Sequence, residues 1–336
     1  MLKGRGKFKS WQINSHLKSV IAQSRHLPKN REHRFGKRPR IPPMLSPHLK
    51  GLLITASGVL IISPDGLLTR LILTDHWTMI FWRALLVSFG MWLMINLLYP
   101  NRAWQQYRTV RGPGLLMVAA YSLGTISFVF AITHTSVANT LIILSSTPLF
   151  AALISRVLLH ERIQLRTLIA ILLVAVGIGV IAAGSAVGSN GLMGDLAAIL
   201  GSFFLACGFS FVRRFPNTSA FAAISCSGLI TALLVLPLAA PLAVSASDFG
   251  YLLLMGLYVV PIGTALMFVG PRYIPAAEVG LLMLLESILG PVWVWMVFAE
   301  QPGLNTLVGG AIVLSTLALN TVWALKYPNY RSALQP

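Results

Sequence analysis

Three ionisable residues, Asp65, Arg83 and Glu286, lie inside long apolar stretches of the sequence. An ionisable side chain at membrane depth is costly, so each of these residues marks a candidate functional position. At ~1.5 Å per helical residue, Asp65 lies about 12 Å and Arg83 about 9 Å from the same end of two neighbouring apolar stretches. This similar depth predicts an ion pair. Such a pair either serves only to hold two helices together, or it leaves Arg83 facing a cavity, where it attracts an anionic or zwitterionic solute.

Glu286 is the third of these residues, and it lies about 15 Å into its own apolar stretch, near the middle of a bilayer. A carboxyl group that titrates near neutrality at this depth could carry a coupling proton. The alternative is a neutral Glu286 that shares hydrogen bonds with Ser or Thr on a neighbouring helix. Glu286 is therefore a candidate both for solute binding and for proton coupling.

Two small polar residues and one aromatic residue complete the candidate site. Asn139 and Ser146 belong to a segment, residues 139–147, that is too polar to face lipid. Such residues either line a cavity or form hydrogen bonds that hold neighbouring helices together. Tyr258 is a candidate cavity wall, with packing between helices as the alternative.

The backbone next to Asp65 is predicted to be irregular. Pro64 removes a backbone donor and kinks a helix, and Gly66 loosens the following turn. Broken helices at membrane depth are tolerated where they line a cavity.

Composition decides which elements position these residues. The chain has 336 residues, of which 56% are hydrophobic and only 10% are charged. A soluble protein carries about 25% charged residues, so much of this surface must face lipid. The two cysteines, Cys207 and Cys226, lie in apolar stretches, which argues against a disulfide framework and a Cys-rich metal site. Histidines are scattered without ligand spacing, so we expect no catalytic residue, no metal and no cofactor.

Long apolar runs alternate with short polar breaks from residue 51 onward, and a helix needs roughly 20 apolar residues to cross the hydrocarbon core. The fold class is therefore all-α integral membrane, with ten transmembrane helices. The predicted spans are 51–73, 77–99, 114–132, 136–158, 166–184, 192–212, 218–240, 249–270, 276–299 and 304–325.

The distribution of charge predicts the orientation, because cytosolic loops are enriched in Lys and Arg. With the N-terminus in the cytosol, the cytosolic connections and the C-terminal tail carry Arg102, Arg108, Arg111, Arg156, Arg162, Arg166, Arg213, Arg214, Arg272, Lys326 and Arg331. The opposite connections carry Asp75, Asp195, Asp248 and Glu300 and no Lys or Arg. Both termini are therefore expected in the cytosol.

An internal repeat divides the chain. A shift of 139 residues places the fourth span on the ninth without a gap, so that Ala138 meets Ala277 and Glu161 meets Glu300. Each unit then holds five helices, an odd number, so the two repeats are inverted with respect to each other. Inverted repeats are a signature of secondary transporters, whose solute site lies near the midplane. We expect repeats at residues 51–184 and 192–325, a basic tail at 1–50 and a short tail at 326–336.

The segment HTSVANTLIILSSTPLFAALISRVLLHERI resembles the fourth helix of the EamA-type unit of the drug/metabolite transporter superfamily. YIPAAEVGLLMLLESILGPVWVWMVFAEQ resembles the matching helix of the second unit, and DHWTMIFWRALL resembles the second helix, with Arg83 as its arginine. The resemblance implies ten helices, a central cavity and alternating access. The family often has Leu-Glu-Pro where this chain has Leu285-Glu286-Ser287, so any break in the ninth span is expected about one turn later, at Pro291.

The tail holds 13 of the 26 Lys and Arg residues and a single acidic residue, Glu32. It is a candidate for lipid or nucleic-acid binding, for organelle targeting, or for no function at all, since Met44 would itself be a natural start. The leading expectation is a transporter of a small organic solute in a bacterial inner membrane, with membrane lipids as neighbours and no nucleic-acid partner. A lipid-acting membrane enzyme and a membrane scaffold that uses the basic tail are the alternatives. The oligomeric state, monomer or homodimer, stays open.

Overall fold

A computed structural model describes residues 46–158, 160, 164–186, 191–270, 273–274 and 276–326. Most of the two tails, together with Glu161, Arg162 and Arg272, lies outside these residues. The helices are α2 (Pro47–Ile62), α3 (Asp65–Leu71), α4 (His76–Leu98), α5 (Ala103–Arg108), α6 (Pro113–His134), α7 (Val137–Leu144), α8 (Thr147–Leu158), α9 (Leu165–Ala186), α10 (Gly191–Arg214), α11 (Ala220–Val235), η2 (Leu236–Leu238), α12 (Ala246–Leu253), η3 (Leu254–Val259), α13 (Val260–Val269), α14 (Ala276–Phe298) and α15 (Leu304–Lys326).

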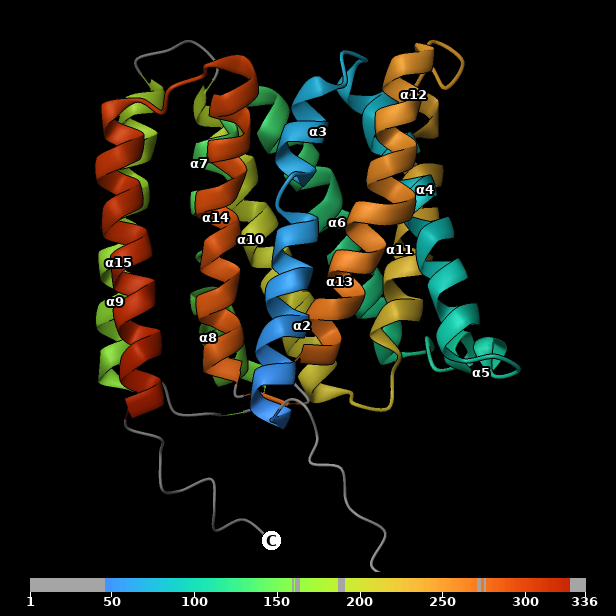
Figure 1. Ribbon diagram of the computed structural model, residues 1–336, viewed down its shortest axis with the longest axis horizontal. Helices are drawn as coiled ribbons and strands as arrows, with labels where there is room; N and C mark the ends of the chain where they lie inside the picture. Colours follow the sequence, from blue (N-terminus) through green and yellow to red (C-terminus); the bar gives the residue numbers. More distant parts are fainter. Residues whose placement is uncertain are drawn as a thin grey trace, which may run out of the picture. The chain divides into compact units, whose positions relative to one another are not determined.

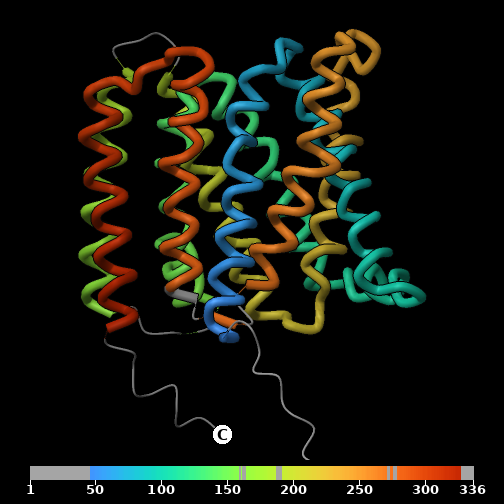
Figure 2. Tube along the Cα trace, in the orientation of Figure 1, coloured from blue at the N-terminus to red at the C-terminus, as the bar shows by residue number. Residues whose placement is uncertain are grey.

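These helices form ten segments within the described residues that are long and apolar enough to cross a membrane. Their ends fall within four residues of the predicted spans. Consecutive segments run up and down a single bundle, as Figures 1 and 2 show. The described chain begins at Ser46 and ends at Lys326 at one end of the bundle, which we name the terminal end; the opposite end is the distal end (Figure 1).

Polar caps explain where several spans begin. Ser46, Asp75, Ser136, Ser219 and Ser245 each accept a hydrogen bond from a backbone N–H in the first turn of the helix that follows. A side-chain oxygen at this position satisfies one of the backbone donors that an α-helix leaves free. The polar breaks in the sequence therefore act as helix starts.

The contacts between spans follow a two-fold pattern. The first span packs on the eighth (α2 with α13), and its counterpart, the sixth, packs on the third (α10 with α6). The pairs α4–α11, α9–α15 and α7–α14 each join a span to its own counterpart in the other repeat. The fold is therefore two inverted five-helix repeats.

Close packing at two glycines follows the same pattern. A Cβ added to Gly194 would lie 2.6 Å from the Thr135 backbone nitrogen and 2.7 Å from the His134 carbonyl carbon. A Cβ added to Gly51 would lie 2.6 Å from the Tyr273 Cβ, and Tyr273 is His134 shifted by 139 residues. The start of the sixth span thus meets the residues just before the fourth, as the start of the first meets a residue just before the ninth.

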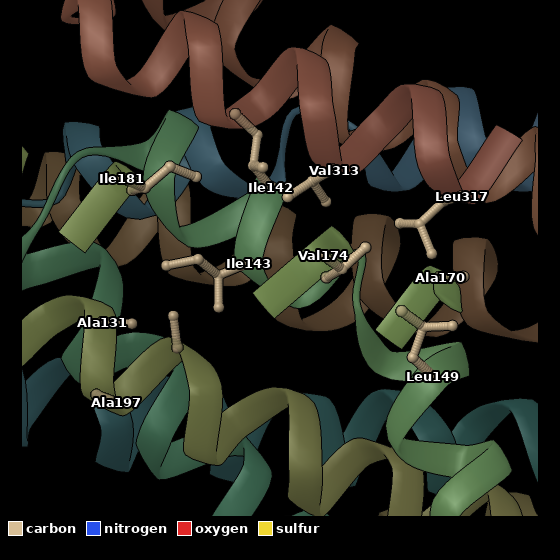
Figure 3. Packing of buried hydrophobic residues seen from close by; sticks show 11 residues of the cluster. Ala131, Ile142, Ile143, Leu149, Ala170, Val174, Ile181, Ala197, Val313 and Leu317 are labelled. Atoms are coloured by element: carbon tan, nitrogen blue, oxygen red, sulfur yellow. The ribbon is translucent and has the colours of Figure 1, made fainter. Parts of the chain in front are cut away.

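Apolar packing holds the helices together on the inside of the bundle. One buried cluster joins α6, α7, α8, α9, α10 and α15 (Figure 3), with members Ala131, Ile142, Ile143, Leu149, Ala170, Val174, Ile181, Ala197, Ala198, Val313 and Leu317. Large apolar side chains such as Leu172 and Leu233 are exposed, by 62% and 61%. Exposed leucines of this kind suit a surface that faces lipid.

Three spans depart from a regular helix. The first breaks at Ser63–Pro64, between α2 and α3, as the proline predicts. The fourth breaks at Ser145–Ser146, and the eighth contains the π-helical turn η3 just before Pro261. The break expected near Pro291 in the ninth span is absent, because α14 runs through the proline without interruption. The counterparts of the irregular spans, α10, α14 and α6, are continuous helices.

Candidate functional site

Asp65 and Arg83 form the predicted ion pair at the break in the first span. Arg83 donates from one terminal nitrogen to Asp65 Oδ1 over 2.6 Å and from the other to Asp65 Oδ2 over 2.8 Å. The residues are only 6% and 7% exposed. Asp65 opens α3 and Arg83 lies in the middle of α4, so the pair joins the first span to the second. A bidentate pair of this kind fixes the orientation of the guanidinium relative to the carboxylate as well as the distance between them.

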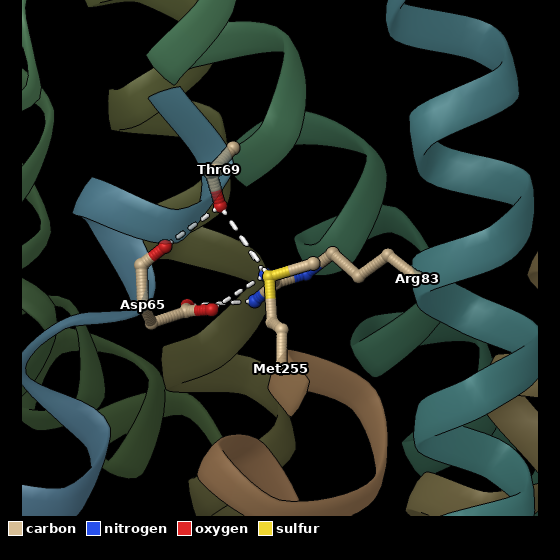
Figure 4. Close-up of polar contacts among 4 residues, drawn as sticks. All are labelled: Asp65, Thr69, Arg83 and Met255. Carbon is tan, nitrogen blue, oxygen red and sulfur yellow. Dashed lines mark hydrogen bonds and ion pairs between the residues drawn. The ribbon is translucent and has the colours of Figure 1, made fainter. Parts of the chain in front are cut away.

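Further contacts enclose the guanidinium group of Arg83 (Figure 4). Thr69 Oγ1 lies 3.5 Å and the Met255 sulfur 2.7 Å from the same Arg83 nitrogen. The ring of Phe128 lies 5.0 Å from the guanidinium carbon, at cation–π distance. The contacts come from α3, η3 and α6, so Arg83 holds together spans of both repeats. The sequence did not reveal Thr69 or Met255 as partners, since neither is unusual within an apolar helix.

Glu286 lies in the middle of α14 and is partly exposed. Among the described residues it forms no hydrogen bond and no ion pair, and its helix packs against α2 and α3, on either side of the break. One turn further along α14, a Cβ added to Gly290 would meet the Leu141 side chain of α7 and lie 3.8 Å from the Ser63 carbonyl oxygen, and two turns further Trp293 donates to the Ser63 hydroxyl over 2.9 Å. The face of α14 that carries Glu286 therefore follows the broken first span.

Asn139 belongs to a different cluster, near the distal end. Its amide nitrogen lies 3.1 Å from Thr135 Oγ1, 3.0 Å from Ser185 Oγ and 3.3 Å from Asp195 Oδ1. Its amide oxygen accepts from the Thr306 hydroxyl over 2.7 Å. These contacts join α7 to α9, α10 and α15, and nothing in the described residues connects them to Asp65, Arg83 or Glu286 by hydrogen bonds.

Two aspartates lie elsewhere than the sequence predicted. Asp195 was expected in a connection between helices, but it lies in the second turn of α10 and is 0% exposed. Asp248 was also expected in a connection, but it lies in the first turn of α12 and is 7% exposed. The count of charges assigned Asp195 to a connection although the predicted span 192–212 contains it, and the predicted span 249–270 began one residue after Asp248.

Ser146 and Tyr258 do not join the other candidates. The Ser146 hydroxyl lies 3.0 Å from the Ser202 hydroxyl on α10, and both side chains are buried. Tyr258 lies in η3, is 51% exposed and makes no hydrogen bond or ring contact within the described residues. The six predicted residues thus occupy separate places: a group around Asp65, Arg83 and Glu286, the Asn139 cluster, the Ser146 contact and Tyr258.

A hollow of about 270 Å³ opens at the terminal end of the bundle. It is lined by Tyr99, Gln106 and Phe268 together with residues 216–221. None of the six predicted residues lines it.

A comparison with protein families finds one family, whose two matches together cover most of the chain. The EamA-like transporter family matches twice, at residues 49–183 and 192–322. The two matches fall on the two groups of five spans. No curated protein matches the chain.

Solved structures are similar in fold. One, described only as "Crystal structure of protein", matches with a TM-score of 0.59 and 16% sequence identity over 83% of this chain and 99% of its own. At this identity the likeness concerns the fold alone. Because two family matches together cover most of the sequence, the chain belongs to the EamA-like transporter family of the drug/metabolite transporter superfamily, a family of membrane transporters that are not enzymes.

Proposed function

We propose that the protein is a secondary transporter that moves a small organic solute by alternating access. In this mechanism the two five-helix repeats rock around a solute site near the midplane, as other inverted-repeat transporters do. The substrate is a metabolite, an amino acid or a drug-like compound. Support comes from the inverted contacts between spans and from the helix break that lies next to buried ionisable groups.

Glu286 carries this proposal. It is a partly exposed carboxyl group in the middle of a membrane span, without a hydrogen bond or an ion pair among the described residues. A carboxyl group in that position requires a proton or a positively charged ligand group to offset its desolvation. We assign it the binding of the solute or of a coupling proton.

Asp65 and Arg83 form the fixed wall of the proposed site. Each already has its main partner, so the Arg83 guanidinium is held in place by Asp65 and is not free to act as a mobile anion receptor. The helix that Asp65 opens, α3, packs against α14, which carries Glu286. Solute contacts by Asn139, Ser146 and Tyr258 stay predictions, since in this conformation the first two bond to neighbouring helices.

We infer that the terminal end faces the cytosol of a bacterial cell, with the protein in its inner membrane. The arginines at positions 102, 108, 111, 213 and 214 lie at the ends of helices or in connections at this end. An excess of Arg and Lys is typical of the cytosolic side. Both chain termini are then cytosolic.

Flux into proteoliposomes tests the proposal. Purified full-length protein is assayed with labelled amino acids, nucleobases and cationic drugs, at several pH values and with an imposed pH gradient. We expect flux for one class and a pH response that Glu286→Gln abolishes. Glu278→Gln is the matched control, because Glu278 is paired with His48 at the terminal end.

Two results would contradict the proposal. Correctly folded protein that moves none of the solute classes would argue against transport of small organic solutes. A Glu286→Gln variant with the flux and the pH response of the parent would remove Glu286 from the mechanism.

A further inference from the structure

Asp195 is a buried carboxylate that its neighbours satisfy only in part. Its Oδ1 accepts from the Thr135 hydroxyl over 2.8 Å and lies 3.3 Å from the Asn139 amide nitrogen. Its Oδ2 is buried and has no hydrogen-bond partner among the described residues. No ion pair of the described residues includes Asp195. A buried carboxylate without a compensating cation is strongly unfavourable.

The surroundings of Asp195 are rich in oxygen atoms and poor in donors. An amide NH2 group has two hydrogens, yet three oxygens surround the Asn139 nitrogen at 3.0–3.3 Å. The Thr306 hydroxyl is used on the Asn139 oxygen. The Asn139 nitrogen, with its partial positive charge, therefore occupies the position that a small cation would take between the same oxygens.

We propose that Asp195, with the side-chain oxygens of Thr135, Asn139 and Ser185, binds a sodium ion, with the Asn139 amide turned so that its oxygen faces Asp195 and its nitrogen faces Thr306. Carboxylate, hydroxyl and amide oxygens are ligands for hard cations. One carboxylate among neutral oxygens balances a single positive charge. Within the described ranges no three His, Cys, Asp or Glu side chains come together, so the site lacks the donors of a transition-metal centre.

The site lies at the distal end, where α6 and α9 end and where α7, α10 and α15 begin. Thr135 is the C-cap of α6, so the negative end of that helix dipole points to the cluster, but the positive ends of α7, α10 and α15 point to it as well. The carboxylate of Asp195, and not the helix dipoles, therefore selects a cation. Ser185 is only partly buried.

Binding of sodium would tie the two repeats together. Thr135, Asn139 and Ser185 belong to the first five spans and the connection before the fourth, whereas Asp195 belongs to the second five. An ion held by both sets of ligands stabilises one relative position of the repeats over another. The use of this ion in coupling rests on the proposed transport function; its binding does not.

The test uses the purified full-length protein and measures thermal unfolding in NaCl, KCl and choline chloride at equal ionic strength, together with binding of radioactive sodium. Sodium at ten times its Kd is expected to raise Tm by about 2 °C or more over choline. Asp195→Asn should lose at least tenfold in sodium affinity. Asp248→Asn, a buried aspartate at the same end of the bundle, should keep the parent's response.

Thr135→Val and Ser185→Ala test the site if Asp195→Asn does not accumulate, because each removes one ligand oxygen with little change in volume. Both should weaken sodium binding by severalfold. Equal Tm in sodium and choline, or an unchanged sodium response in Asp195→Asn or in both hydroxyl variants, would overturn the site. These readouts need no solute, so a failure of the sodium site is distinct from a failure of the transport proposal.

Discussion

The indole N–H of Trp293 in α14 donates to the hydroxyl of Ser63, the residue that ends α2. The ninth span is therefore tied to the first at the point where the first is broken. Glu286 lies two turns earlier on the same helix as Trp293, so this hydrogen bond sets the position of the proposed site relative to the break.

We expect Trp293→Phe to lower the free energy of unfolding by about 1 kcal/mol, because it keeps the ring but removes the donor. Ser63→Ala should cost a similar amount, and the double variant should cost less than the sum of the two. Thermal unfolding in detergent measures this. Trp295→Phe is the control on the same helix, since Trp295 is 52% exposed and should be neutral. Additive losses for Trp293 and Ser63 would show that the bond does not contribute.

Asp65→Leu or Arg83→Met alone should destabilise the protein by about 3 kcal/mol, because each leaves a buried charge without its partner. The double variant removes both charges and should recover most of that loss. The unfolding temperatures of the two single variants and the double variant test whether the double variant recovers this loss. A double variant as unstable as either single one would mean that the pair is not the main source of the effect.

Gly194→Ala should be strongly destabilising, because the new Cβ would meet the backbone of His134 and Thr135 at 2.6–2.7 Å. Gly51→Ala should behave in the same way, as its counterpart in the other repeat. Gly179→Ala has open space and should be neutral or stabilise by about 0.5–1 kcal/mol through helix propensity. If Gly194→Ala unfolded at the parent's temperature, the close approach of α10 to the end of α6 would be wrong.

Asp75 caps α4 outside the membrane span. Burial alone would raise the pKa of its carboxyl, but hydrogen bonds from Thr78 and from the Trp77 amide outweigh it and lower the pKa below the ordinary value. The cap therefore contributes fully above the ordinary Asp pKa of about 3.9 and is lost as the pH falls through the lowered value. Asp75→Ala should cost about 1 kcal/mol at neutral pH and progressively less in acid. A cost independent of pH would exclude the charged cap as its source.

The proposed orientation predicts which loops a membrane-impermeant maleimide reaches in intact cells. In a background that lacks Cys207 and Cys226, Leu242→Cys at the distal end should react directly. Asn217→Cys at the terminal end should react only after the membrane is permeabilised. The reverse pattern would place the termini outside.

Hydropathy and charge predicted the ten spans well, because crossing a bilayer demands a long apolar helix wherever one occurs. The depth argument also predicted the pair Asp65–Arg83, since adjacent antiparallel helices bring equal depths together. The buried role of Asp195 was not predicted, because its partners Thr135 and Asn139 are distant in sequence and ordinary in type. Ser146 looked like a cavity residue for the same reason: its partner Ser202 lies 56 positions away.

The backbone breaks between α2 and α3 and between α7 and α8 have no equivalent in α10 and α14. Two repeats with identical backbones would interchange their roles when the transporter turns from one side to the other, and its two end states would have equal energies. In this structure only the first repeat has those broken spans, so the two repeats are not equivalent. In the proposed alternating-access cycle, inward-facing and outward-facing states in which the same spans stay broken would differ in energy before any solute or ion arrives, and the polypeptide itself would favour one side.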